Sequence, residues 1–156
     1  MATLPILTVQ AAERLLTTLE DYLEKSEASY AMVIDRGGII LSQHGHLPDG
    51  ADATVLAALS AGSFAATREL ALRVGEADCN ALYQQGTQSH ILISAVDGDI
   101  MLVTVFNSRT TVGLVKFYSA KTVKTIRAVL NDSRTHARHE TVFSSQDVDA
   151  AGTLFE

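Results

Sequence analysis

The sequence predicts an α/β fold of the α+β type: a five-stranded antiparallel sheet with helices on both faces. Three observations indicate it. Apolar residues recur at helical spacing in residues 8–25, 52–74 and 112–131. Five shorter apolar or alternating runs are bounded by turn residues, as strands are. One of these runs, residues 99–106, is apolar on both faces, which is typical of a central strand covered on both sides.

The composition is that of a folded protein with one domain. Of its 156 residues, 47% are hydrophobic and 19% are charged, whereas disordered chains show the opposite balance. The net charge of -6 argues against nonspecific binding to nucleic acid or to anionic membranes, because both attract basic surfaces. Apolar runs are shorter than the roughly 18 residues that span a bilayer, and no signal peptide precedes the first helix. We therefore expect a cytoplasmic protein without direct membrane insertion.

The first half of the chain begins with an amphipathic helix followed by a hairpin. The helix is predicted over residues 8–25, and its outward side carries four acids, either a solvated surface or an acidic docking site: Glu13, Glu20, Asp21 and Glu24. Residues 29–34 and 38–42 are short apolar runs. The turn between them, residues 35–38, has the sequence Asp-Arg-Gly-Gly, and glycine supplies the positive φ that tight hairpins need.

Residues 52–74 predict one long helix that is apolar on two sides. Asp49 or Asp52 is expected to cap its start and Gly75 its end. The face expected to lie on the core comprises Val55, Leu56, Leu59, Ala66, Leu70 and Val74. The opposite face comprises Ala57, Ala61, Phe64, Ala65 and Leu72. Small residues there permit close approach of another backbone, so this second face predicts a partner; the alternative is a helix buried on both sides within one domain.

The second half predicts a three-stranded meander and a last helix. Residues 80–85, 88–95 and 99–106 are strand-like, and the last of them is expected in the middle of the sheet. In the helix over residues 112–131, the inward stripe is Val115, Ser119, Val123, Ile126 and Leu130. Its outward side is cationic, and it is solvated, complementary to an acidic partner, or complementary to this protein's own acidic first helix: Lys116, Lys121, Lys124 and Arg127. Residues 1–131 then form the domain, and the polar residues 132–156 form a flexible tail.

Candidate groups for catalysis or metal binding are few. His44 and His46 alternate in a loop but lack a third anchored ligand, so a solvated loop is favoured over a metal site. Cys79 is the only cysteine, and no histidine or basic residue is close to it in sequence to activate it, which favours a small buried apolar residue over a nucleophile. Phosphate-binding glycine motifs do not occur in the sequence. We therefore expect no catalytic residue, no metal and no cofactor.

Three segments together carry a family resemblance: AMVIDRGGIILSQHG at residues 31–45, the alanine-rich helix after it, and ILISAVDGDIMLVTVFN at residues 91–107. In this order they resemble the Roadblock family, which includes dynein light chains and bacterial regulators of small GTPases, over about residues 9–130. The resemblance implies a profilin- or longin-like sandwich, with the long second helix on one face of the sheet and the first and last helices on the other. It also implies pairing of two copies through the long helix and the strand after it, as a continuous sheet.

The resemblance implies a non-enzymatic homodimer that binds a Ras-like small GTPase and modulates its nucleotide hydrolysis or localisation. The residues it places in dimer or partner binding are Ala57, Ala61, Phe64, Ala65, Arg68, Leu72, Ala81 and Tyr83. Some GTPase activators supply a cationic finger, and Arg68 and Arg109 are the candidates here, each otherwise a surface or interface residue. The alternative function is a structural subunit of a motor or signalling complex that leaves GTP turnover unchanged.

Overall fold

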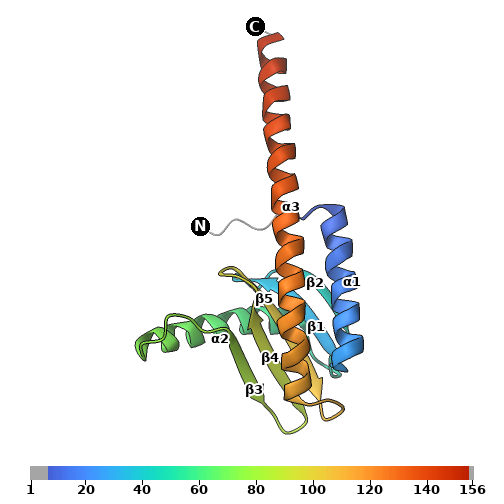
Figure 1. Ribbon diagram of the computed structural model, residues 1–156, viewed down its shortest axis with the longest axis vertical. Helices are drawn as coiled ribbons and strands as arrows, with labels where there is room; N and C mark the ends of the chain where they lie inside the picture. The colour runs from blue at the N-terminus through green and yellow to red at the C-terminus, as the bar shows by residue number, and fades with distance from the viewer. Residues whose placement is uncertain (1–6, 155–156) are drawn as a thin grey trace.

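The predicted helices and strands all occur in the structure, a computed structural model that describes residues 7–154, with side chains described for residues 7–135. In chain order they are α1 (Val9–Ser26), β1 (Tyr30–Asp35), β2 (Ile40–Gly45), α2 (Ala53–Arg73), β3 (Ala81–Gln85), β4 (Ser89–Ala95), β5 (Ile100–Asn107) and α3 (Val112–Leu154). Figure 1 shows the sheet with α3 running across it.

The strands form one antiparallel sheet in the order β2-β1-β5-β4-β3. The apolar strand β5 is central, as predicted, and it is buried along its length up to Asn107. It pairs with β1 on one side and β4 on the other, which joins the first hairpin to the meander. The strands β2 and β3 are therefore the two edges of the sheet, and β3 has a hydrogen-bonded neighbour only in β4.

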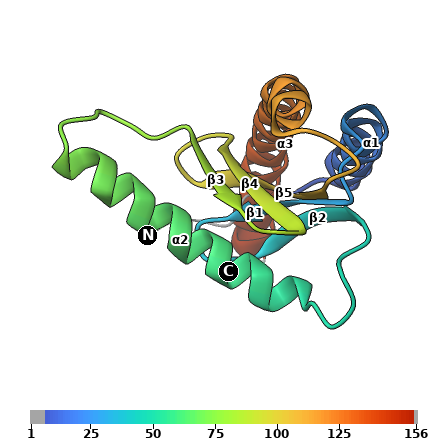
Figure 2. The same ribbon diagram turned by 90° about the horizontal axis from the view of Figure 1, so that it is seen from below.

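Helices cover the two faces of the sheet in the predicted way: α2 lies on one face, and α1 and α3 lie side by side on the other (Figure 2). Amphipathicity orients α1 and α3. The whole predicted inward stripe of α3 is buried, from Val115 to Leu130, and in α1 the buried residues include Leu15, Leu19 and Tyr22. The α1 and α3 face and the α2 face therefore have separate apolar cores.

The sequence prediction for the two faces of α2 was wrong at most positions, although Leu56 packs on the core and Ala65 and Leu72 are exposed, as expected. Ala57, Ala61 and Phe64, expected to face a second copy, are 0%, 5% and 2% exposed and pack on the sheet. Leu59 and Leu70, expected in the core, are 64% and 66% exposed. Because both sides of the helix are apolar, helical periodicity identified the two faces but could not tell which one packs inward.

The small residues of α2 do allow another backbone to come close, but that backbone is the first hairpin of the same chain. Gly38 in the β1–β2 turn has φ +85°, and a Cβ added there would lie 2.9 Å from the Cα of Ala58. Two backbones therefore meet with no room for a side chain between them. Asp52 caps the start of α2 by accepting from the backbone N–H of Thr54 at 2.8 Å. Gly75, with φ +89°, follows the end of the helix as predicted.

The last helix is longer than predicted. The expected end was near residue 131, with a flexible polar tail after it, whereas α3 continues to Leu154, a length of 43 residues. Its C-terminal half projects beyond the sheet in Figure 1. The polar composition after residue 131 suggested an end, but no proline or early glycine interrupts the chain there, and polar residues are compatible with an exposed helix.

Candidate functional site

Apolar side chains are exposed along the whole length of α2, and the C-terminal end of this helix lies near the edge strand β3. We define the outer face of α2 as Val55, Leu59, Leu70 and, directly after the helix, Val74. The C-terminal end of α2 extends beyond β3, the edge strand (Figure 2). Exposed contiguous apolar residues and an unpaired strand edge are both features that a partner usually covers. Of these residues, Leu70 and Val74 belong to the C-terminal end of α2, near β3, whereas Val55 and Leu59 lie toward the start of the helix.

Five of the eight predicted partner residues line one groove of about 260 Å³ between α2 and the β4–β5 turn. These five are Ala61, Phe64, Ala65, Arg68 and Leu72. Leu72 follows Ala61 and Ala65 along the same side of α2, but it is 55% exposed, because α2 overhangs the sheet there. The structure thus brings the predicted partner residues between Ala61 and Leu72 together in one groove. Ala57, further toward the start of α2, is wholly buried and does not line it.

Arg68 is held in place by its neighbours. Its Nη1 donates to the carbonyl oxygen of Gly98 at 3.1 Å, and its Nε lies 3.5 Å from Asp78 Oδ1. A guanidinium with these two contacts joins α2 to the loop before β3 and to the β4–β5 turn, which suits a structural role better than a mobile cationic finger. Arg109, the other candidate, is exposed in the loop before α3.

The two predicted residues on β3 lie away from α2. Tyr83 faces the α1 and α3 side, where its ring stacks on Phe106 with centroids 6.1 Å apart. Ala81 is exposed at the start of the edge strand and lines a groove beside α3. Both residues therefore lie on the edge strand β3, on the opposite face of the sheet from α2. A partner would contact them together with α2 if it paired along β3.

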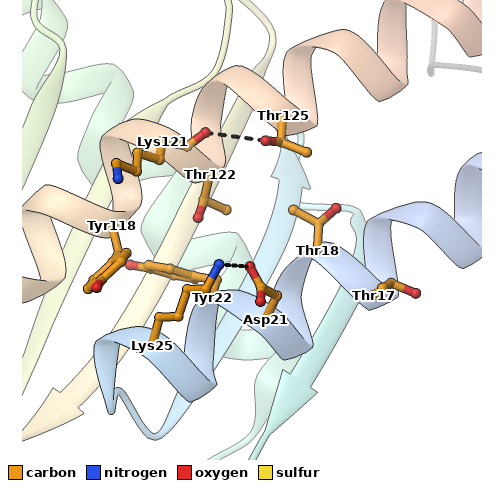
Figure 3. A pocket seen from close by; sticks show the side chains of 9 residues that line it. All are labelled: Thr17, Thr18, Asp21, Tyr22, Lys25, Tyr118, Lys121, Thr122 and Thr125. Carbon is orange, nitrogen blue, oxygen red and sulfur yellow. Dashed lines mark hydrogen bonds and ion pairs between the residues drawn. The ribbon is translucent and has the colours of Figure 1, made fainter.

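A second groove, of about 560 Å³, separates α1 from α3 and is lined by hydroxyl-bearing side chains (Figure 3). We call it the threonine groove, after Thr17, Thr18, Thr122 and Thr125. Tyr22 forms part of its wall, and the Tyr22 hydroxyl lies 2.8 Å from Thr104 Oγ1. Burial raises the pKa of Tyr22, more than the hydrogen bond with Thr104 lowers it.

Polar groups of the threonine groove are largely satisfied within the chain. Thr17 donates to the Glu13 carbonyl oxygen at 3.0 Å, and Thr18 donates to the Arg14 carbonyl oxygen at 2.7 Å. Lys25 Nζ lies 2.9 Å from Asp21 Oδ2, and this hydrogen bond raises the pKa of Lys25. A ligand would have to compete with each of these bonds, so the groove is a weak candidate for a binding site.

The candidate metal and nucleophile residues are dispersed. His44 and His46 are exposed on and after β2, and within residues 7–135 no three His, Cys, Asp or Glu side chains are grouped as metal ligands. Cys79 is half-buried, less than predicted, and its Sγ lies 3.3 Å from the Ala81 carbonyl oxygen. By length and composition alone, α2 is the one helix of the described chain that could cross a membrane, a criterion that helices packed in soluble domains also meet.

Comparison with known proteins finds one matching domain family and several solved structures with a similar fold. The Roadblock/LC7 domain profile matches residues 14–106. Gliding protein MglB from Thermus thermophilus is similar, with TM-score 0.78 and 28% identity over 85% of this chain and 99% of that chain. A structure described as MglB with tetrameric arrangement has TM-score 0.79 and 27% identity, over 85% and 99%. Profilin II from Acanthamoeba castellanii shares the fold, with TM-score 0.53 and 16% identity over 73% and 97%.

A search of curated proteins finds no match. The domain match is nevertheless extensive, because residues 14–106 run from α1 to β5 and include all five strands and α2. The strand order and the division of the helices between the two faces agree with the sandwich expected from the resemblance. The chain therefore belongs to the Roadblock/LC7 family.

Proposed function

We propose that this protein is a cytoplasmic, non-enzymatic homodimer that binds a Ras-like small GTPase and changes its rate of nucleotide hydrolysis or its localisation. The observation that carries the proposal is the exposed outer face of α2, together with the C-terminal end of this helix that extends beyond the edge strand β3. Family membership supports the regulatory role, because the Roadblock family that the sequence resembles includes bacterial regulators of small GTPases.

Pairing of two copies along β3 would extend the sheet across a two-fold axis and satisfy the free backbone groups of both edge strands. The same symmetry would bring the two α2 helices together on one side of the extended sheet. Leu72 and the outer face of α2, which are exposed in one copy, would then be covered in part by the second copy. The face assignment removes Ala57, Ala61 and Phe64 from this interface, since they fill the core.

A platform made of paired α2 helices can regulate a GTPase without a catalytic group of its own. Hydrolysis in small GTPases depends on the order of their switch loops, and a partner that holds those loops in a competent geometry accelerates the reaction. The apolar residues that remain exposed on α2 suit such a contact, because the buried centre of a protein interface is apolar and poor in charged residues. In this proposal the hydrolytic chemistry belongs to the GTPase.

The test is GTP hydrolysis by a Ras-like GTPase of the same organism, measured with and without the full-length protein. We expect a faster rate, lost in Leu59→Asp because a charge is placed in the centre of the outer face of α2. The matched control is Phe117→Asp, since Phe117 is also exposed but lies on α3, on the opposite face of the sheet. Binding without a change in rate would instead support the scaffold subunit, and equal effects of the two substitutions would contradict the placement of the platform on α2.

A further inference from the structure

A groove on the α1 and α3 face combines an apolar floor with a cationic rim. It exists because α3 crosses over β4 and leaves the edge strand β3 without a helix above it (Figure 1). Its volume is about 520 Å³. The floor includes Leu92 and Val123, both buried, and the rim is formed by Lys116, Lys124 and Arg127. We call it the lysine groove.

The charges of the lysine groove are unusual for this protein. The chain carries a net charge of -6, yet the charged residues that line the groove are all cations. Elsewhere in residues 7–135, cations are mostly paired: salt bridges are formed by Arg14, Lys25, Arg36, Arg68, Arg73 and Arg134. Among the described residues, no carboxylate forms a salt bridge with Lys116, Lys124 or Arg127. Like charges gathered without a counter-charge favour an anionic partner.

Two of the three cations have neighbours that restrict where they reach. Lys116 Nζ lies 5.9 Å from the centroid of the Tyr83 ring, toward the edge strand. Arg127 Nε donates to the Val96 carbonyl oxygen at 2.9 Å, which leaves its two terminal nitrogens able to bind an acceptor. Lys116 and Arg127 are eleven residues apart on α3, which is about 16.5 Å at about 1.5 Å per residue. A row of this length is better matched by an extended surface than by one small anion.

We propose that the lysine groove binds an acidic amphipathic helix of a partner protein. The apolar stripe of that helix would lie on the floor, and carboxylates one or two turns apart would pair with the cations of the rim. The apolar floor favours a protein helix over nucleic acid, whose phosphates need a wider basic surface.

The lysine groove and the outer face of α2 lie on opposite faces of the sheet (Figure 2). One copy of the protein could therefore hold a GTPase on α2 and a second partner on α3 at the same time. The inference goes beyond the proposed function and does not depend on it, because the residues of the groove come from one chain. Failure of the GTPase assay would leave the groove proposal intact, and the reverse also holds.

The test uses fluorescence anisotropy with the full-length protein and a fluorescein-labelled synthetic helix of about 20 residues, long enough to be helical when bound. Its apolar stripe is leucine, and the flanking positions are glutamate; the comparison peptide has lysine at those positions. We expect the glutamate peptide to bind with micromolar affinity that weakens with added salt, and the lysine peptide not to bind. Absence of binding by the glutamate peptide up to millimolar concentration would overturn the proposal.

Matched variants locate the binding site. Lys124→Glu reverses a charge on the rim, and Lys121→Glu makes the same change on α3 but in the threonine groove. We expect Lys124→Glu, and separately Lys116→Glu, to lower the binding affinity for the glutamate peptide by about threefold to tenfold. Lys121→Glu should lower this affinity by less than about twofold. Circular dichroism checks that each variant is folded. Equal losses for Lys121→Glu and Lys124→Glu, or tighter Lys124-dependent binding to phosphatidylserine vesicles or to single-stranded DNA than to the peptide, would refute the acidic helix as the occupant.

Discussion

Replacing Phe64 by alanine tests which face of α2 lies on the sheet. The Phe64 side chain is 2% exposed and packs in the core under α2. Truncation of a buried phenylalanine to alanine typically costs about 3–5 kcal/mol, the sum of lost apolar burial and of the cavity left behind. Since domains are stable by only about 5–15 kcal/mol, this is a large share. For a chain of this size we expect a melting temperature lower by about 6–20 °C.

The matched variant is Leu70→Ala, on the outer face of the same helix. Leu70 is 66% exposed, so within one copy its truncation removes little buried surface and should cost less than about 1 kcal/mol. If the outer face is covered by a second copy, that cost grows with protein concentration, because it acts through association. The cost of Phe64→Ala should not depend on concentration in this way.

Urea denaturation followed by circular dichroism, repeated at several protein concentrations, separates the two effects. The reasoning is refuted by the reverse order, in which Leu70→Ala costs several kcal/mol at every concentration and Phe64→Ala is nearly neutral. That result would mean that the face with Leu59 and Leu70 packs on the sheet, as the sequence predicted.

Two further predictions concern positions that hold the two layers on the sheet. Gly38→Ala should lower the melting temperature more than Gly50→Ala does. Both glycines have positive φ, but an added Cβ would meet the Ala58 backbone at Gly38, whereas it would meet nothing within 4 Å at Gly50. Equal losses of stability would show that backbone conformation alone accounts for the cost. Burial raises the pKa of Tyr22 above its ordinary value of 10.0, so the unfolded chain loses this proton first as pH rises, and the contribution to stability is complete below pH 10 and falls above it. In alkaline unfolding, Tyr22→Phe should make the decline of stability above that pH less steep, and an unchanged slope would contradict the assignment to Tyr22.

Several features followed from the sequence because one local signal determined each of them. In α1 and α3 one side is mostly apolar and the other mostly polar or charged, so Leu15, Leu19 and Ile126 are buried where periodicity placed them. β5 is apolar on both faces, which only a central strand with helices above and below can satisfy, and it is central. Asp52 caps α2 because its carboxylate reaches backbone N–H groups two and three residues further on, a strictly local contact.

The end of α3 and the surfaces for binding depended on longer-range structure. Polar residues beyond residue 131 are compatible with both a tail and a solvated helix, and the structure continues the helix to Leu154. The lysine groove required knowing that α3 lies over β4, which brings α3 side chains beside Leu92 and Ala95. Sequence spacing placed the cations on one side of a helix, but it could not supply the apolar floor.

The sequence by itself determined the elements, the strand that is central and the family, because periodicity, turn residues and caps are local. Only the tertiary structure decided which side of α2 is inside, since both sides are apolar. The physical reason is distance: Gly38 in the first hairpin and the small residues around Ala57 and Ala58 let two backbones touch, so the alanine side packs inward. The larger residues Val55, Leu59 and Leu70 are thereby left on the surface, where they are available to a second protein.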